Sequence, residues 1–169
     1  MKVLIVSDTH GRHETLLRIL NNENGYEMLI HCGDTEGGEG WIRQHAKCLS
    51  VPIVKGNNDF FGQLPHDLEL DIAGHHAFIT HGHRYGVSMG TERLEEEASS
   101  RKADLCFFGH THRPVIEKTE SGIWIVNPGS LSYPRQEGRD PTYVIMDVEE
   151  GKEPRFELKK MMRPGGGYY

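Results

Sequence analysis

Five short clusters of histidine, aspartate and asparagine recur along this chain, and they contain the residue types that bind divalent metal ions. The clusters are Asp8-Thr9-His10, Gly33-Asp34, Gly56-Asn57-Asn58-Asp59, His81-Gly82-His83 and Gly109-His110-Thr111-His112. Carboxylate, imidazole and amide ligands without thiolate suit Mn²⁺, Fe, Ni²⁺ or Zn²⁺ better than Ca²⁺. This mixture is typical of hydrolytic sites that hold two metal ions, and the five clusters supply enough ligands for two.

Each cluster follows a short apolar run, which is the pattern of a buried strand that ends in a polar residue. The runs cover residues 3–6, 28–30, 51–54, 78–80 and 105–108. In open α/β sheets, ligands bind at the carboxyl ends of the strands. The sequence therefore predicts that the clusters meet at this edge of the fold.

The order of the predicted elements indicates two sheets. Strands are expected at 2–7, 27–32, 51–55 and 104–108, and extended segments at 66–72 and 75–81. Helices are expected at about 12–22 and about 90–101, and a short helix that ends at about 47 follows a glycine-rich loop. After His112 the chain has β-rich stretches at 114–120, 123–127, 142–148 and 154–160, separated by glycine-containing turn signals. We predict an α/β fold, a four-layer α/β/β/α sandwich of two mixed β-sheets flanked by helices. No Gly-x-Gly-x-x-Gly opens the first helix, which argues against a Rossmann half.

Length and charge restrict the classes of function. With 169 residues, the chain is expected to form a single domain over 1–169, with a flexible tail at about 161–169. With a formal net charge of −6, the chain is not expected to present the stripe of basic residues that binding of a long nucleic acid requires. A small phosphorylated substrate at a local cationic centre is compatible with this charge.

The N-terminus resembles no signal peptide, and no segment has the length of a membrane span. The three cysteines, Cys32, Cys48 and Cys106, are expected to be reduced thiols, so we predict a cytoplasmic protein without a membrane partner. Cys32 lies beside Gly33-Asp34, and the hard ligands around it favour a buried, inert thiol over a soft metal ligand.

Several of the eleven histidines are expected to have other roles. His31 is predicted to be a packed imidazole or one that supports a ligand. Five others are predicted to be solvated surface residues: His13, His45, His66, His75 and His76.

The five clusters, in this order, resemble the calcineurin-like metallophosphoesterases. The pattern of that family is Asp-x-His, Gly-Asp, Gly-Asn-His-Glu or Asp, His-Gly and Gly-His-x-His. Asn127-Pro128-Gly129-Ser130 and Pro134-Arg135 also resemble the C-terminal signature of its small single-domain bacterial and archaeal phosphodiesterases. The resemblance implies two divalent ions, with Mn²⁺ favoured over Ni²⁺, Fe or Zn²⁺. It assigns Asp8, His10, Asp34 and His112 to one ion, and Asp34, Asn57, His81 and His110 to the other, with Asp34 bridging.

The same resemblance implies in-line attack on phosphorus by a hydroxide that bridges the metals. Asp34, Asn58, Asp59 and His83 are the candidate catalytic residues, and Asn58, His83 and Arg135 are the candidate substrate contacts. Asp59 is expected either to orient a ligand or histidine, or to stabilise the turn after Asn57-Asn58. His83 follows His81 by two residues, so on an extended chain it points to the same side. Arg135 can bind two phosphate oxygens at once.

One position departs from the phosphoprotein phosphatase branch of the family. That branch has histidine in Gly-Asn-His-Glu, where it is regarded as helping to protonate the leaving oxygen, and this chain has Asn58. An amide cannot act as that acid. The small phosphodiesterase group also lacks the histidine, so Asn58 separates this chain from the protein phosphatases.

The resemblance therefore implies a dinuclear metal-dependent phosphodiesterase of small phosphoesters. Two alternatives stay open. One is a non-catalytic metal-binding scaffold or interaction module, because a retromer subunit uses this fold for binding. The other is a nuclease, although the nucleases of this family carry extra capping domains and this chain is short and acidic. A homodimer also stays open.

Overall fold

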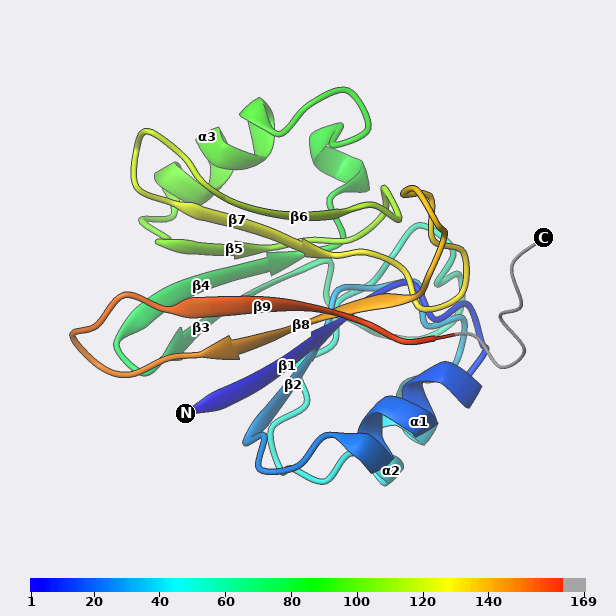
Figure 1. Ribbon diagram of the computed structural model, residues 1–169. Coiled ribbons are helices and arrows are strands. Elements are labelled where there is room, and N and C mark those ends of the chain that lie inside the picture. The colour runs from blue at the N-terminus through cyan, green and yellow to red at the C-terminus, as the bar shows by residue number, and fades with distance from the viewer. Residues whose placement is uncertain (163–169) are drawn as a thin grey trace.

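The computed structural model describes residues 1–162 and contains two β-sheets that pack face to face (Figure 1). The four-stranded sheet has the order β2-β1-β8-β9, formed by β2 (Met28–His31), β1 (Lys2–Val6), β8 (Thr142–Asp147) and β9 (Arg155–Lys160). The five-stranded sheet has the order β3-β4-β5-β7-β6, formed by β3 (Asp67–Ile72), β4 (His75–Thr80), β5 (Leu105–Phe107), β7 (Trp124–Pro128) and β6 (Pro114–Lys118). Both sheets are mixed, because β1–β2, β4–β5 and β5–β7 are parallel pairs and the other pairs are antiparallel.

Helices cover the outer faces of the two sheets, which confirms the predicted sandwich. Helices α1 (Glu14–Asn22) and α2 (Glu39–His45) pack on the four-stranded sheet, and α3 (Glu92–Ser100) packs on the five-stranded sheet (Figure 1). A short 3₁₀ helix, η1 (His83–Tyr85), follows β4.

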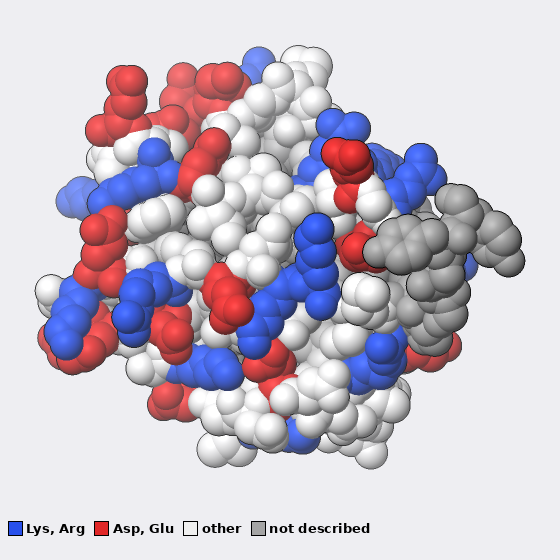
Figure 2. All heavy atoms as spheres, in the orientation of Figure 1, with Lys and Arg blue, Asp and Glu red and all other residues white. Residues whose placement is uncertain are grey.

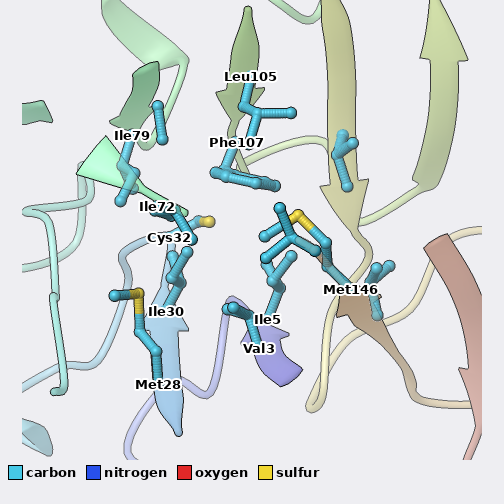
Figure 3. Packing of buried hydrophobic residues seen from close by; sticks show 14 of the residues in the cluster. Val3, Ile5, Met28, Ile30, Cys32, Ile72, Ile79, Leu105, Phe107 and Met146 are labelled. Atoms are coloured by element: carbon cyan, nitrogen blue, oxygen red, sulfur yellow. The ribbon is translucent and has the colours of Figure 1, made fainter. Parts of the chain in front are cut away.

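Alternating side chains of β1 explain the layers. Val3 and Ile5 point into the core between the sheets, where they face residues such as Phe107 (Figure 3). Leu4 and Val6 point to the opposite face and pack against the layer of α1 and α2. The period of two along a strand therefore gives β1 two apolar faces, as expected for a central strand covered on both sides.

The predicted strand at 51–55 is wrong as a continuous element. The segment forms only isolated bridges beside β2, which pair Met28 with Ser50 and His31 with Ile53. The amides of Leu29 and His31 donate to the carbonyls of Ser50 and Pro52. The next ladder bond would need an N–H from Pro52, which proline lacks, so the parallel ladder is interrupted there.

The other element boundaries agree with the sequence prediction to within two residues. At the start of the predicted tail, Met161 is buried and its amide donates to the carbonyl of Pro141. The rest of that tail, residues 163–169, lies outside the described residues. Within residues 1–162, no helix is long and apolar enough to cross a membrane.

Candidate metal centre

The predicted ligands lie in loops that follow β1, β2, β4 and β5 and in the segment after Val54. Among the described residues, nine non-glycine residues have a positive φ, and five of them are predicted ligands: Asp8, His10, Asp34, His110 and His112. This left-handed conformation costs roughly 1–2 kcal/mol for a residue with a side chain. A concentration of such residues at one place is typical of a functional site, where the surrounding structure holds the strain.

Asp8, His10, Asp34 and His112 form the first group of predicted ligands. Each offers one ligand atom, and these atoms lie within 4.8 Å of one another. His112 Nε2 is 3.0 Å from Asp8 Oδ1 and 3.3 Å from His10 Nε2. Asp8 Oδ1 is buried and accepts no hydrogen bond from any described residue. A buried carboxylate oxygen that faces imidazole nitrogens in this way fits a divalent cation.

The second group of predicted ligands adjoins the first. The side-chain oxygen of Asn57, Oδ1, is 2.8 Å from His110 Nδ1 and 3.1 Å from His81 Nε2. Oδ2 of Asp34 is 3.5 Å from His81 Nε2 and 3.8 Å from His10 Nε2. The structure thus brings all seven predicted ligands together, with Asp34 between the two groups.

Hydrogen bonds behind three histidines fix which ring nitrogen faces the centre. His81 Nδ1 donates to the carbonyl oxygen of Cys32 at 2.7 Å, and His112 Nδ1 donates to the carbonyl oxygen of Tyr133 at 2.8 Å. His10 Nδ1 lies 2.7 Å from the Glu36 carboxylate. Because these oxygens only accept, each Nδ1 carries a proton, and Nε2 is the nitrogen that faces the centre and would offer its lone pair to a bound metal. This arrangement is typical of metal-binding histidines.

Two glycines leave the space that the ligands occupy. A Cβ added at Gly33 would lie 2.7 Å from His81 Nδ1. A Cβ added at Gly109 would collide with Ser7 Oγ and lie 2.8 Å from Asp8 Oδ2. Gly33 also has φ of +98°, which residues with a side chain rarely adopt.

Both carboxylates of the centre are ionised at neutral pH. Burial raises the pKa of Asp34, but hydrogen bonds with His81 and Asn58 outweigh burial and hold that pKa well below its usual range. Burial likewise opposes ionisation of Asp8, whereas the nearby His112 and the charge of His81 lower its pKa overall. The centre therefore presents two anions to a cation.

Asn58 contacts the shared carboxylate directly. Its backbone N–H donates to Asp34 Oδ1 at 2.8 Å, and its side-chain Nδ2 donates to Asp34 Oδ2 at 2.7 Å.

Asp59 is buried and holds the loop around Asp34. One carboxylate oxygen accepts from the amides of Asp34 at 2.9 Å and Gly56 at 2.8 Å. The other accepts from the Thr35 hydroxyl at 3.0 Å and the Glu36 amide at 2.6 Å. The two predicted roles of Asp59 coincide here, because the same carboxylate stabilises its turn and orients the ligand backbone.

His83 lies beside the second group of ligands, although the predicted extended chain is wrong. The backbone turns at Gly82, with φ of +95°, and enters η1. The His83 ring centroid is nevertheless 5.3 Å from that of His81 and 6.1 Å from that of His110. Burial and the charges of His81 and His110 lower the pKa of His83 to about 4.

Arg135 is tied to the centre through its backbone. Its amide donates to the carbonyl oxygen of His112 at 3.0 Å, while its side chain is exposed and lines an adjacent cavity with Tyr133.

His31 packs beneath the ligand loops. Its Nδ1 accepts from the Gly33 amide at 3.2 Å, so its Nε2 donates to the Thr9 hydroxyl at 3.1 Å. Burial lowers the pKa of His31 to about 4. Cys32 is also buried, and its side chain points into the core between the sheets (Figure 3).

The sequence analysis missed several residues that support the centre. Glu36 bonds His10, and the Tyr133 ring lies 5.0 Å from the His10 ring. The hydroxyls of Ser130 and Ser132 donate to the carbonyls of Asp8 and Thr9. Glu36 follows Asp34 by two residues, so its position near the centre could have been inferred from the sequence. The contacts of the two serines join residues more than 120 positions apart, which no local pattern indicates.

The histidines predicted to be solvated differ from one another. His66 is exposed, but the other four are half-buried. His13 and His45 stack on Trp41, with ring centroids 4.3 Å and 4.0 Å away. His75 forms an ion pair with Asp104 at 2.6 Å, so the prediction overlooked specific partners.

Known proteins with similar sequences include phosphoesterases. A family model described as the calcineurin-like phosphoesterase superfamily domain matches residues 1–151. The probable metallophosphoesterase YsnB of Bacillus subtilis is 35% identical over 150 residues, which cover 88% of this chain and 85% of that protein. Phosphodiesterase MJ0936 of Methanocaldococcus jannaschii is 30% identical over 148 residues, which cover 76% of this chain and 83% of that protein.

Solved structures share the fold. The structure of a predicted phosphoesterase from Streptococcus pneumoniae TIGR4 aligns with a TM-score of 0.82 and 24% identity, covering 97% of this chain and 93% of that chain. Vps29 from Entamoeba histolytica complexed with Zn²⁺ aligns with a TM-score of 0.74 and 21% identity, covering 95% and 99%. At these identities the two structures support the fold alone. From the family match and its sequence relatives, the chain belongs to the calcineurin-like phosphoesterase superfamily.

Proposed function

We propose that this protein is a dinuclear metal-dependent phosphodiesterase that hydrolyses small phosphodiesters. The observation that carries the proposal is the position of Asp34, whose Oδ2 lies between His10 Nε2 of one ligand group and His81 Nε2 of the other. A carboxylate shared by two ligand groups is the arrangement that holds two cations close together. Mn²⁺ is the metal we expect, with Ni²⁺, Fe and Zn²⁺ as alternatives that the same ligands accept.

Two bound divalent ions would neutralise phosphate charge and lower the pKa of water at the centre to about 7. The chain's own residues prepare the site for this chemistry. His81 and His112 turn Nε2 toward the centre, because carbonyl oxygens accept the hydrogen bonds of their Nδ1 atoms. Asp59 holds the Asp34 backbone, and Asn58 holds the Asp34 carboxylate. Counting Asp8 and Asp34 as two negative charges, two divalent ions leave the centre at +2, which attracts a phosphodiester anion.

The test combines metal content with turnover. Protein loaded with Mn²⁺ should contain two ions per chain by elemental analysis and should hydrolyse bis(p-nitrophenyl) phosphate until chelator is added. Mn²⁺, Ni²⁺ and Zn²⁺ should be compared on a panel of phosphodiesters and monoesters. One ion per chain after loading would reject the dinuclear centre, and the absence of turnover with every metal would reject the enzyme.

A matched pair of variants locates the centre. Asp34→Asn removes a charged ligand from both ions and should cause the largest loss of bound metal among single ligand variants. Asp147→Asn is the control, because Asp147 is an exposed carboxylate on β8. Full metal content in Asp34→Asn would remove the shared carboxylate from the proposal.

The likeness to Vps29 supports a second candidate, a metal-binding interaction module. His110→Ala separates the candidates, because His110 is half-buried at the centre and contributes little to the core. In an enzyme this variant should lose turnover while circular dichroism shows a folded protein. An inactive wild type across metals and substrates would instead favour the module. The third candidate, a nuclease, predicts cleavage of long DNA or RNA, which the net charge of −6 disfavours.

A further inference from the structure

An arginine-lined cavity adjoins the metal centre. It has a volume of about 690 Å³, and its lining includes Arg12, Arg113, Arg135 and Arg139. Ligand sites commonly occupy about 300–1,000 Å³. The described lining contains no acidic side chain, although the whole chain carries a net charge of −6. The cavity is therefore a local cationic region on an acidic protein.

Most of these guanidinium groups have no anionic partner among the described residues. Arg113 and Arg135 form no side-chain hydrogen bond or ion pair within residues 1–162, and Arg12 lies over the Tyr133 ring at 4.8 Å. By contrast, Arg101 bonds Glu69 and Glu97 on the five-stranded sheet and α3. Arg12, Arg113 and Arg135 thus keep their hydrogen-bond donors available for a ligand.

The cavity is fixed to the centre by the chain itself. The Arg12 amide donates to the carbonyl of Thr9 at 2.9 Å, next to ligand His10, and the Arg135 amide donates to the carbonyl of His112 at 3.0 Å. Tyr133 separates the cavity from the ligands, with its ring centroid 5.0 Å from that of His10 and 6.4 Å from that of His112. A ligand in the cavity would therefore lie about one aromatic ring from the metal ligands.

We propose that this cavity binds a second phosphate of the substrate, so the enzyme prefers phosphodiesters that carry a further, terminal phosphate. This inference rests on the proposed function for its substrate, because the scissile phosphodiester would lie at the metal centre. Guanidinium groups suit the second phosphate, since each can donate two hydrogen bonds to its oxygens. The reaction cleaves only the scissile ester, and the second phosphate supplies binding energy.

Two esters with the same scissile bond test the preference. They are the p-nitrophenyl ester of thymidine 5′-phosphate and the same ester with an added 3′-phosphate. The wild type should show a KM about tenfold lower for the ester with the 3′-phosphate, because charge-assisted hydrogen bonds contribute roughly 1.5–3 kcal/mol each and tenfold corresponds to about 1.4 kcal/mol. The ratio of the two KM values should shrink at high salt.

The double variant Arg12→Gln/Arg113→Gln should abolish the preference and leave the KM for the simpler ester unchanged. Arg155→Gln is the control, because Arg155 is exposed at the start of β9 and lines a different cavity. Thermal unfolding should show that both variants are folded. Equal KM values for the two esters in the wild type, or a preference that survives in the double variant, would overturn the inference while the phosphodiesterase stands.

A binding measurement tests the cavity independently of the turnover assay. Thymidine 3′,5′-bisphosphate should bind chelator-treated wild type more tightly than thymidine 5′-phosphate does in calorimetry, and the double variant should lose that difference. If neither ester is hydrolysed, the proposed function fails and this measurement alone decides about the cavity. Equal affinities of the two nucleotides for the wild type would overturn the inference that the cavity binds a second phosphate.

Discussion

In the proposed enzyme, Asn58 would limit the chemistry that the centre can perform on the leaving group. Its side-chain amide donates to Asp34, it stands where the phosphoprotein phosphatase motif has histidine, and an amide has no proton to give at neutral pH. General-acid catalysis is worth roughly 10²- to 10⁴-fold in rate. An enzyme without it must depend on the intrinsic stability of the departing oxyanion.

We therefore expect a steep dependence of kcat on the pKa of the leaving group, with aryl diesters cleaved much faster than alkyl diesters. Asn58→His should flatten that dependence, mainly by raising the rates of the poor leaving groups. A series of phosphodiesters with graded leaving groups measures the slope. A shallow slope in the wild type would mean that another group protonates the leaving oxygen, and His83→Ala would then be the variant that steepens it.

Asp59 is a buried carboxylate that fixes the backbone around Asp34, a predicted metal ligand, and is not itself one of the predicted ligands. It accepts three hydrogen bonds from the loop that carries Asp34 and a fourth from the Gly56 amide of its own loop. Asp59→Asn replaces one acceptor oxygen by an NH₂ group that faces N–H or O–H donors. We expect a loss of stability of roughly 1–3 kcal/mol and a 10- to 100-fold weaker affinity for Mn²⁺.

Urea denaturation and Mn²⁺ titration of Asp59→Asn measure both effects. Asp71→Asn is the matched control, because Asp71 is exposed and caps only the amide of Gly74 in the β3–β4 turn. Unchanged Mn²⁺ affinity in Asp59→Asn would show that its hydrogen bonds do not position the ligand.

At the scale of elements, hydrophobic periodicity predicted most helices and strands, because each of these elements buries apolar side chains on one face or on both faces. It failed at 51–55, where the apolar run is real and buried but Pro52 lacks the N–H that a parallel ladder needs. It also failed after β4, where Gly82 turns the chain into η1. The position of His83 beside His81 could not follow from an extended pattern, because it depends on that turn.

Gly40 in α2 and Gly109 at the centre differ in the free space beside them, so replacing each by alanine should have different effects. A Cβ at Gly40 in α2 meets nothing within 4 Å, so Gly40→Ala should stabilise the protein by roughly 0.5–1 kcal/mol through the lower entropy of the unfolded chain. Gly109→Ala should destabilise it and weaken metal binding, because its Cβ would collide with Ser7 and crowd Asp8. Thermal unfolding of the two variants compares them, and a lower midpoint in Gly40→Ala would contradict the account.

At the scale of the whole molecule, the centre exists because two sheets present their strand ends on the same side. Asp8 and His110 are 102 residues apart in sequence, yet the His110 amide donates to Asp8 Oδ2. The motifs predicted this convergence, since each follows a strand. The arginine-lined cavity gave no such signal beyond the single candidate Arg135, because Arg12, Arg113 and Arg135 come from separate loops without a shared pattern. On the face shown in Figure 2, positive and negative side chains are interspersed.

His75 joins the two sheets at the end of β4 away from the centre. Its Nδ1 lies 2.6 Å from Asp104 Oδ2, and its Nε2 lies 2.9 Å from the carbonyl of Lys152 in the β8–β9 turn. Both partners only accept, so both ring nitrogens must carry protons, and the doubly protonated ring is the form that fits. Burial lowers the pKa of His75, but the Asp104 carboxylate and the Lys152 carbonyl raise it overall.

A pKa that is raised on folding means that the stability from this link is fully present below about pH 6.5, the ordinary value for histidine, and is lost as pH rises through the folded value. The free energy of unfolding of the wild type should therefore exceed that of His75→Gln most at low pH, and the difference should shrink as pH increases. Urea denaturation at several pH values measures it. His76→Gln is the control, because the neighbouring His76 pairs with Glu69 where both side chains are exposed and solvent screens the ion pair. A difference between wild type and His75→Gln that does not change with pH would show that His75 acts by packing and that its charge does not join the sheets.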